Sequence, residues 1–374
     1  IMVFGNSLSA GTPTDATVTT AKLADSAVTA AKITDATITA AKLASGTVQN
    51  QSAFKNIIIN GDMSIAQRAT SASSLTSSGY HTVDRFRCVI SSAGTWTISQ
   101  STTVPTGQGF AKSLKWDNTT ADGSLGASDF VSVQQFIEGQ NLQYLKKGTS
   151  NAESLTVSFW VRSNKTGTYI LELKDNDNTR AISQSYTISS ADTWEKKTLT
   201  FAGDTTGTLD NDNAASFLVQ FALAAGSSYQ SGTLQTSWGA ETTANRYVGQ
   251  VNLADSTSNE WYMTGLQVEV GTSASDFEFL PADVNLARCQ RYFEKTLDKF
   301  LFTGSGNVAD RAITLNYTVQ KRATPTVTFS DITADGGGSL IAQTFSNAKH
   351  LCVEMSGGSG GRQFFANYKA DAEL

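Results

Sequence analysis

The sequence predicts a mainly β protein with an N-terminal intertwined stalk, a jelly-roll β-sandwich, a short helix and a small C-terminal β domain. Three observations lead to this prediction: a ten-residue repeat near the N-terminus, many segments in which apolar and polar residues alternate, and a weakly charged composition. Only 16% of the 374 residues are charged, whereas soluble domains average roughly 25%. We expect the three domains to cover residues 1–52, 53–283 and 284–374.

The stalk prediction rests on residues 15–44, which contain three copies of the repeat, with a fourth copy beginning at Ser45. A large aliphatic residue recurs at every fifth position from Val18 to Val48. Neither a continuous helix nor a continuous strand places residues five apart on one face. One such chain has too little apolar surface to offset the entropy of ordering it. We therefore interpret the segment as a stalk of three identical chains, the alternative being a disordered linker.

The sandwich prediction rests on strands with a period of two. The alternation is clearest in Leu155–Arg162, where four apolar residues point to one side. Phe54–Ile59 resembles a short apolar strand before a turn. Further strands are predicted at 95–100, 111–116, 130–137, 168–174, 197–201, 217–223, 247–253 and 261–270. This many short strands between polar loops indicate two packed sheets of the jelly-roll kind.

A helix is predicted at residues 283–294, with Asp283 as its N-cap. Strands return at 312–319, 326–329, 351–355 and 363–368, and they predict the small C-terminal β domain. Gly336–Gly338 and Gly357–Gly361 are expected to form loops between these strands.

Charge and cysteine content restrict the possible partners and compartments. The net charge of −5 gives no indication of a nucleic-acid partner. The sequence has no transmembrane segment, so we expect no membrane insertion. We also expect no signal peptide. Cys88, Cys289 and Cys352 match no metal or disulfide spacing. They fit a protein that folds in a reducing cytoplasm and is used outside it. The start at Ile1 suggests that a preceding region is missing.

A set of motifs follows one order along the chain: 56–68, 83–86, 155–169, 191–204, 261–271, 277–278, 288–293 and 368–374. The most specific is Trp261-Tyr-Met-Thr-Gly-Leu-Gln-Val-Glu-Val-Gly271. In these motifs, and in the repeats before them, the chain resembles the carbohydrate-binding-module-like domain and C-terminal tip of bacteriophage tail fibres. The resemblance spans most of residues 15–374. It implies a homotrimeric fibre in the virion, assembled in the host cytoplasm, which binds a host-surface polysaccharide or lipopolysaccharide. The phage tail or baseplate would hold it through the missing N-terminal region.

Candidate residues for glycan binding are Trp160, Arg162 and Trp238. By alternation, Trp160 and Arg162 lie on the polar face of their strand, where an indole can stack on a sugar ring. The alternative is that a loop covers Trp160. Trp238 lies in a polar loop, while Trp194 and Trp261 are expected in the core.

Candidate catalytic groups are few. Gly357–Gly361 matches the G-x-S-x-G pattern, but strands flank it and His350 precedes it, so a hairpin loop is expected. His350 and His81 are the only histidines, too little material for histidine-based chemistry. Asp276 and Glu278 could form the carboxylate pair of a glycan hydrolase, although such pairs are common on solvated strands.

Residues 174–180 contain four oxygen-bearing side chains in a row, which could bind Ca²⁺ or form an Asx-rich hairpin turn. The turn is the expected structure. We predict no catalytic residue, metal or cofactor, and a non-catalytic protein that binds a host glycan. A fibre-borne polysaccharide depolymerase and a structural spacer without receptor specificity are the alternatives.

Overall fold

The computed structural model describes residues 54–296, 299–304, 311–334, 339–356 and 362–374. The chain divides into two units between Gln51 and Ser52. The predicted trimeric stalk therefore lies outside the described residues, as do the glycine-rich stretches Gly336–Gly338 and Gly357–Gly361.

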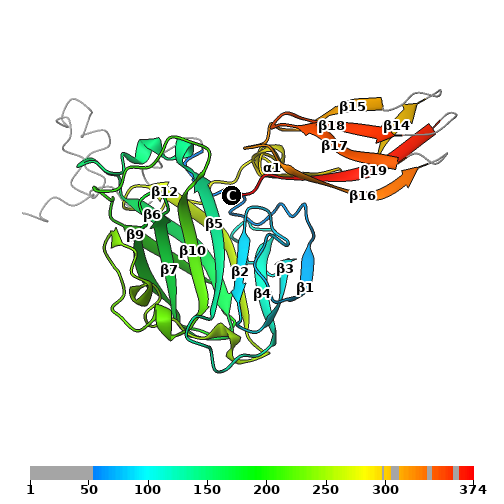
Figure 1. Cartoon of the computed structure of the whole chain (residues 1–374). Coiled ribbons are helices and arrows are strands. Elements are labelled where there is room, and N and C mark those ends of the chain that lie inside the picture. The colour runs from blue at the N-terminus through cyan, green and yellow to red at the C-terminus, as the bar shows by residue number, and fades with distance from the viewer. Residues whose placement is uncertain (1–53, 297–298, 305–310, 335–338, 357–361) are drawn as a thin grey trace, which may run out of the picture. The chain divides into compact units, whose positions relative to one another are not determined.

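Two six-stranded antiparallel sheets form the predicted jelly-roll β-sandwich and appear as stacked layers in Figure 1. The first sheet has the order β1-β3-β4-β12-β6-β9. Its strands are β1 (Ser71–Leu75), β3 (Thr95–Ser101), β4 (Ser113–Thr120), β12 (Glu260–Val270), β6 (Leu155–Ser163) and β9 (Glu195–Phe201). The second sheet has the order β11-β8-β7-β10-β5-β2. Its strands are β11 (Gly239–Ala240), β8 (Arg180–Ile188), β7 (Gly167–Asp175), β10 (Ala215–Ala225), β5 (Phe130–Glu138) and β2 (Arg87–Ser91).

The core lies between the two sheets, because alternate residues of each strand face inward. Leu155, Val157, Phe159 and Val161 of β6 are all buried, as the alternation predicts. Trp261 is also fully buried, which confirms its predicted core position. All three cysteines are free, and Cys88 and Cys289 are buried.

Eight of the nine predicted sandwich strands are present, with shifted ends, but the strand at 247–253 is wrong. Tyr247 instead stacks on Phe130 of β5, with the ring centroids 4.9 Å apart. Gln250 accepts a hydrogen bond from the backbone N–H of Ile170, at 2.8 Å. Tyr247 packs on the outer face of the second sheet, whereas Leu253 joins the main core. The apolar residues of this segment therefore reflect burial rather than strand pairing.

The predicted strand Phe54–Ile59 is also wrong, since these residues form no strand. The backbone of Ile59 is instead satisfied by the side chain of Gln135, which both accepts from its N–H and donates to its carbonyl oxygen. Ile57, Ile58 and Ile59 are buried, but they form no regular strand pairing. Short 3-10 turns lie at Gly139–Asn141, Gln143–Leu145, Ser227–Tyr229, Thr243–Asn245 and Leu253–Asp255.

The helix α1 spans Ala282–Gln290 and is shorter than predicted. Pro281 occupies the N-cap position without a side-chain capping bond, so the prediction of Asp283 as N-cap is wrong. Asp283 lies in the first turn, where a carboxylate stabilises the positive end of the helix dipole. The helix stops early because Phe293–Lys295 form β13, which pairs with β19.

The C-terminal part is β-structured, as predicted, and contains two smaller antiparallel sheets. In one, β19 (Arg362–Asp371) pairs with β13, β14 (Phe300–Gly304) and β16 (Thr326–Ala334). The other has the order β15-β18-β17, formed by β15 (Arg311–Asn316), β18 (His350–Ser356) and β17 (Ser339–Ser346). The sequence did not predict β13, β14 or β17. The tail after β19 returns to the sandwich, where Tyr80 donates a hydrogen bond to the carbonyl oxygen of Leu374 at 3.0 Å.

Candidate glycan-binding face

Trp160 and Arg162 lie on the outer face of β6, as the alternation predicts. Both side chains are half-buried, while their neighbours in sequence point into the core. The register places Arg162 beside Tyr262 of β12, and Tyr262 beside Lys115 of β4. Residues directly opposite each other in antiparallel strands lie on the same side of a sheet. Three neighbouring strands therefore contribute to one surface.

We call the surface formed by Trp160, Arg162, Trp194 and Tyr262 the aromatic face. The guanidinium carbon of Arg162 lies 5.0 Å from the centroid of the Tyr262 ring. The rings of Trp194 and Tyr262 meet edge to face, with centroids 6.2 Å apart. Arg162 is held in place by Asp192, whose carboxylate and carbonyl oxygens accept bonds of 2.7 and 2.9 Å. The face thus combines aromatic surface with a positioned cation, a combination that suits a sugar ring and its oxygens.

Trp194 was predicted to lie in the core, and this is wrong. It is half-buried and packs on Tyr262, whose ring lies on the outer side of the first sheet. Its indole nitrogen is buried without a hydrogen-bond partner among the described residues. Trp194 immediately precedes β9, which pairs with β6, so the sheet order brings it to this face. The alternation of β9 could have indicated this, because Leu199 and Phe201 face the core and Trp194 has the opposite parity.

An ion pair borders the aromatic face. Lys115 donates to Glu260 at 2.6 Å, and the Tyr262 hydroxyl donates to the same carboxylate at 2.7 Å. Burial alone would raise the pKa of Glu260, but these two hydrogen bonds outweigh burial and lower it. Glu260 is therefore ionised at neutral pH. An ionised carboxylate can accept hydrogen bonds from sugar hydroxyls but has no proton to donate to a leaving group.

Trp238, the third predicted residue, lies at a different place. Its indole N–H donates to the carbonyl oxygen of Ala202 at 2.8 Å, and its ring packs against Phe217 with centroids 6.1 Å apart. The Lys147 ammonium lies 5.0 Å from the ring centroid. The structure thus brings Trp160 and Arg162 together, but not Trp238. One side of the Trp238 ring packs against the edge of the core.

The carboxylates near residues 174–180 hold a lysine. The ammonium of Lys147 donates to Asp175, to Asp204 at 2.9 Å and to the carbonyl oxygen of Gly207 at 2.9 Å. This side chain fills the position between the acids that a cation would need. No group of three or more potential metal-binding residues occurs in the described part of the chain. The expected hairpin turn is present, because β7 ends at Asp175 and β8 begins at Arg180.

The remaining candidates are engaged in structural contacts. The two carboxylate oxygens of Glu278 accept the backbone N–H groups of Phe54 and Asn56. His81 is half-buried, and burial lowers its pKa. His350 lies on β18 within hydrogen-bond distance of Asn347, at 3.0 Å. Among the described residues, no helix has the length and apolarity that membrane crossing requires.

No protein-family model matches the sequence, and no curated protein matches it. Among solved structures, the chain is similar to the enzymatically active domain of tailspike protein 4 from bacteriophage CBA120. The identity is 11% and the TM-score 0.30, over 58% of this chain and 22% of that one. The module TmCBM61 in complex with β-1,4-galactotriose is 9% identical, with a TM-score of 0.30, over 58% of this chain and 99% of that one.

A family 11 carbohydrate-binding module from Clostridium thermocellum, in complex with a β-1,3-1,4-mixed-linked tetrasaccharide, is 11% identical. Its TM-score is 0.25, and the match covers 51% of this chain and 91% of that one. Our chain spans about a fifth of the length of the tailspike chain, at 22%. Similarity at this level concerns the β-sandwich fold alone.

Proposed function

We propose that this chain is a bacteriophage tail-fibre protein that attaches the virion to a host-surface glycan, and that the aromatic face is its binding surface. The observation that carries the proposal is the convergence of Trp160, Arg162, Trp194 and Tyr262 on the outer face of one sheet. Tyr262 is buried there, and the other three side chains are half-buried. The fibre-like motifs and repeats of the sequence support the phage assignment. The ligand is a polysaccharide or lipopolysaccharide, bound without cleavage.

Weak binding at each face suits a homotrimer. A stacking contact contributes about 0.5–1.5 kcal/mol, which changes the affinity of one site by about two- to tenfold. Three faces on one fibre, and several fibres on one virion, multiply this effect through avidity. The stalk would join the three chains, and the region before it would attach to the tail or baseplate.

Host-cell binding by purified protein tests the proposal. Trp160→Ala and Arg162→Ala should each lower binding to host cells at least tenfold, since three sites lose a contact together. Phe279→Ala is a matched control, because Phe279 is an exposed aromatic residue at 51% of its maximal exposure and lies outside the aromatic face. Equal binding by all four proteins would reject the aromatic face. Absence of binding by the wild-type protein would favour the spacer alternative.

The depolymerase alternative predicts the release of reducing ends from host polysaccharide. A hydrolase of this kind needs a carboxylic acid that stays protonated near neutral pH, and the lowered pKa of Glu260 does not favour that role. Release of reducing ends by the wild-type protein would replace the non-catalytic proposal.

A further inference from the structure

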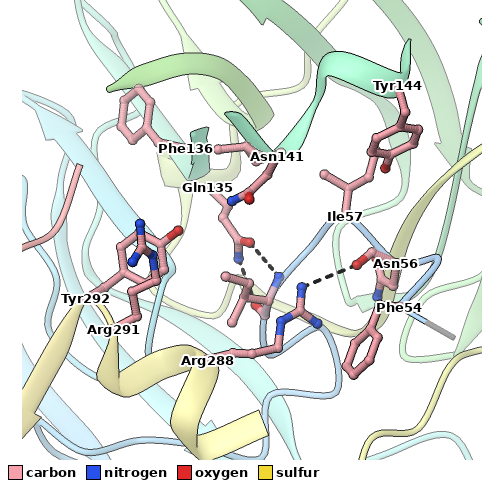
Figure 2. A pocket seen from close by; sticks show the side chains of 12 residues that line it. Phe54, Asn56, Ile57, Gln135, Phe136, Asn141, Tyr144, Arg288, Arg291 and Tyr292 are labelled. Atoms are coloured by element: carbon pink, nitrogen blue, oxygen red, sulfur yellow. Dashed lines mark hydrogen bonds between the residues drawn. The ribbon is translucent and has the colours of Figure 1, made fainter. Parts of the chain in front are cut away.

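A second concave site lies away from the aromatic face. It is a pocket of about 430 Å³, within the range of small-molecule sites. Its walls come from residues 54–59, from the end of β5 with the turns that follow, and from α1 with the two residues after it. Figure 2 shows Arg288 entering it from α1, and Asn141 and Tyr144 from the segment after β5. We call it the Arg288 pocket.

Arg288 carries a charge that forms no ion pair within the described residues. Its Nη2 is 3.5 Å from the carbonyl oxygen of Asn56, which is a long hydrogen bond. Its Nη1 is buried without a hydrogen-bond partner among the described residues. Burial lowers the pKa of Arg288, and the nearby negative charge of Glu278 opposes this effect. The carboxylate oxygens of Glu278 accept the backbone N–H groups of Phe54 and Asn56 and form no ion pair with Arg288.

Arg291, one turn further along, gives a direct comparison. Its guanidinium forms two bonds with Glu138, at 2.9 and 2.7 Å, whereas Arg288 forms no ion pair within the described residues. Burial lowers the pKa of Arg288, although an arginine stays protonated in proteins. A desolvated cation without a counter-charge is unfavourable, so an anion that enters the pocket gains its attraction.

The remaining lining suits a ring rather than a bare ion. Ile57, Ile59 and Ile137 provide an apolar lining. Tyr144 and Phe54 are both exposed, at 49% and 59%, and offer aromatic surface to a ligand. Tyr144 and Arg288 both line the pocket. Partial burial raises the pKa of Tyr144, and the positive charge of Arg288 opposes that rise.

We propose that the Arg288 pocket binds an anionic sugar unit, with its carboxylate or phosphate on Arg288 and its ring against Tyr144 and Phe54. The exposed amide of Asn141 can bond to the hydroxyls of such a unit. Charge-assisted bonds to a guanidinium are roughly twice as strong as neutral ones, which makes the anionic group the main determinant. The Arg288 pocket shares no residue with the aromatic face, and its strand residues belong to β5 of the second sheet. Arg288 forms no ion pair within the described residues, whereas Arg162 pairs with Asp192.

Saturation-transfer NMR and calorimetry on the full chain test the proposal, with galacturonate, glucose 6-phosphate and neutral galactose as ligands. We expect galacturonate, glucose 6-phosphate or both to bind at millimolar concentration, and galactose at least tenfold more weakly. Arg288→Gln should abolish binding of the anionic sugars, and Tyr144→Ala should weaken it several-fold. Lys146→Gln is the control, because it removes an exposed cation that pairs with Glu153 outside the pocket.

The two anionic ligands separate the sources of the charge. Binding of galacturonate alone assigns a sugar acid, and binding of glucose 6-phosphate alone assigns a phosphorylated unit. Binding of neither, equal binding of galactose, or binding unchanged in both Arg288→Gln and Tyr144→Ala would overturn the proposal. Tyr144 is half-exposed, so its variant decides the question even if Arg288→Gln changes the fold. Host-cell binding by Trp160→Ala reports on the aromatic face independently.

Discussion

The C-terminal tail is expected to stabilise the sandwich through Glu373, which forms a buried ion pair with Arg85. The side chains of Arg85 and Glu373 are only 1% and 5% exposed. The Arg85 guanidinium also stacks on Tyr292, 3.4 Å from the ring centroid, and donates to the carbonyl oxygen of Phe136 at 2.7 Å. In Glu373→Gln these two neutral contacts remain, but Arg85 loses its carboxylate partner.

The size of the effect follows from this burial. Removal of one partner of a buried ion pair costs about 3–5 kcal/mol, because it leaves a desolvated charge. Arg68 also contacts Glu373, at 3.3 Å, and keeps Asp371 as a second partner at 2.9 Å. We therefore expect Glu373→Gln to lower the free energy of unfolding by about 3 kcal/mol. For a domain of 150–250 residues this corresponds to a fall in Tm of roughly 6–12 °C.

Calorimetry and urea titration monitored by tryptophan fluorescence measure this loss. Asp371→Asn is the matched control, since Asp371 is 43% exposed and should contribute at most about 1 kcal/mol. Glu373→Gln introduced into an Arg85→Met background should cost much less than in the wild type, because the buried charge is already gone. The reasoning fails if Glu373→Gln costs no more than Asp371→Asn.

Three other predictions concern stability and assembly. Burial raises the pKa of Asp84 to about 6, above its ordinary value of 3.8. The stability that protonated Asp84 contributes is therefore fully present below pH 3.8 and is lost as the pH rises through 6. The stability of the wild type relative to Asp84→Asn should therefore fall by about 2 kcal/mol from pH 4 to pH 7 in urea titrations. A difference that does not change with pH would contradict the shift. Lys147→Met should lower the free energy of unfolding by about 3–5 kcal/mol, because Asp175 and Asp204 lose their shared cation. A loss below about 1 kcal/mol would refute this. Ca²⁺ should not raise the Tm of the wild type. Light scattering should give three times the chain mass of 39.7 kDa, whereas a monomer would reject the intertwined stalk.

The sequence by itself determined the fold class and the orientation of individual side chains. The alternation in Leu155–Ser163 placed Trp160 and Arg162 on the outer face of β6, because the side-chain period of a strand is fixed at two. It also identified the class of the sandwich and a short helix near residue 283. Its errors at 54–59 and 247–253 have one cause. Apolar residues there are buried by contacts with side chains and with sheet faces, and periodicity alone does not distinguish such burial from strand pairing.

Only the tertiary structure decided which residues share a site. Trp194 and Tyr262 are far apart in the chain, and they meet because β9 and β12 both pair with β6. In the same way, the Arg288 pocket combines segments that begin near Phe54, Gln135 and Arg288. The charge of Arg288 is visible in the sequence, but the absence of an ion pair to it among the described residues is not. That property depends on which acids the fold brings near, and contacts between distant segments determine it.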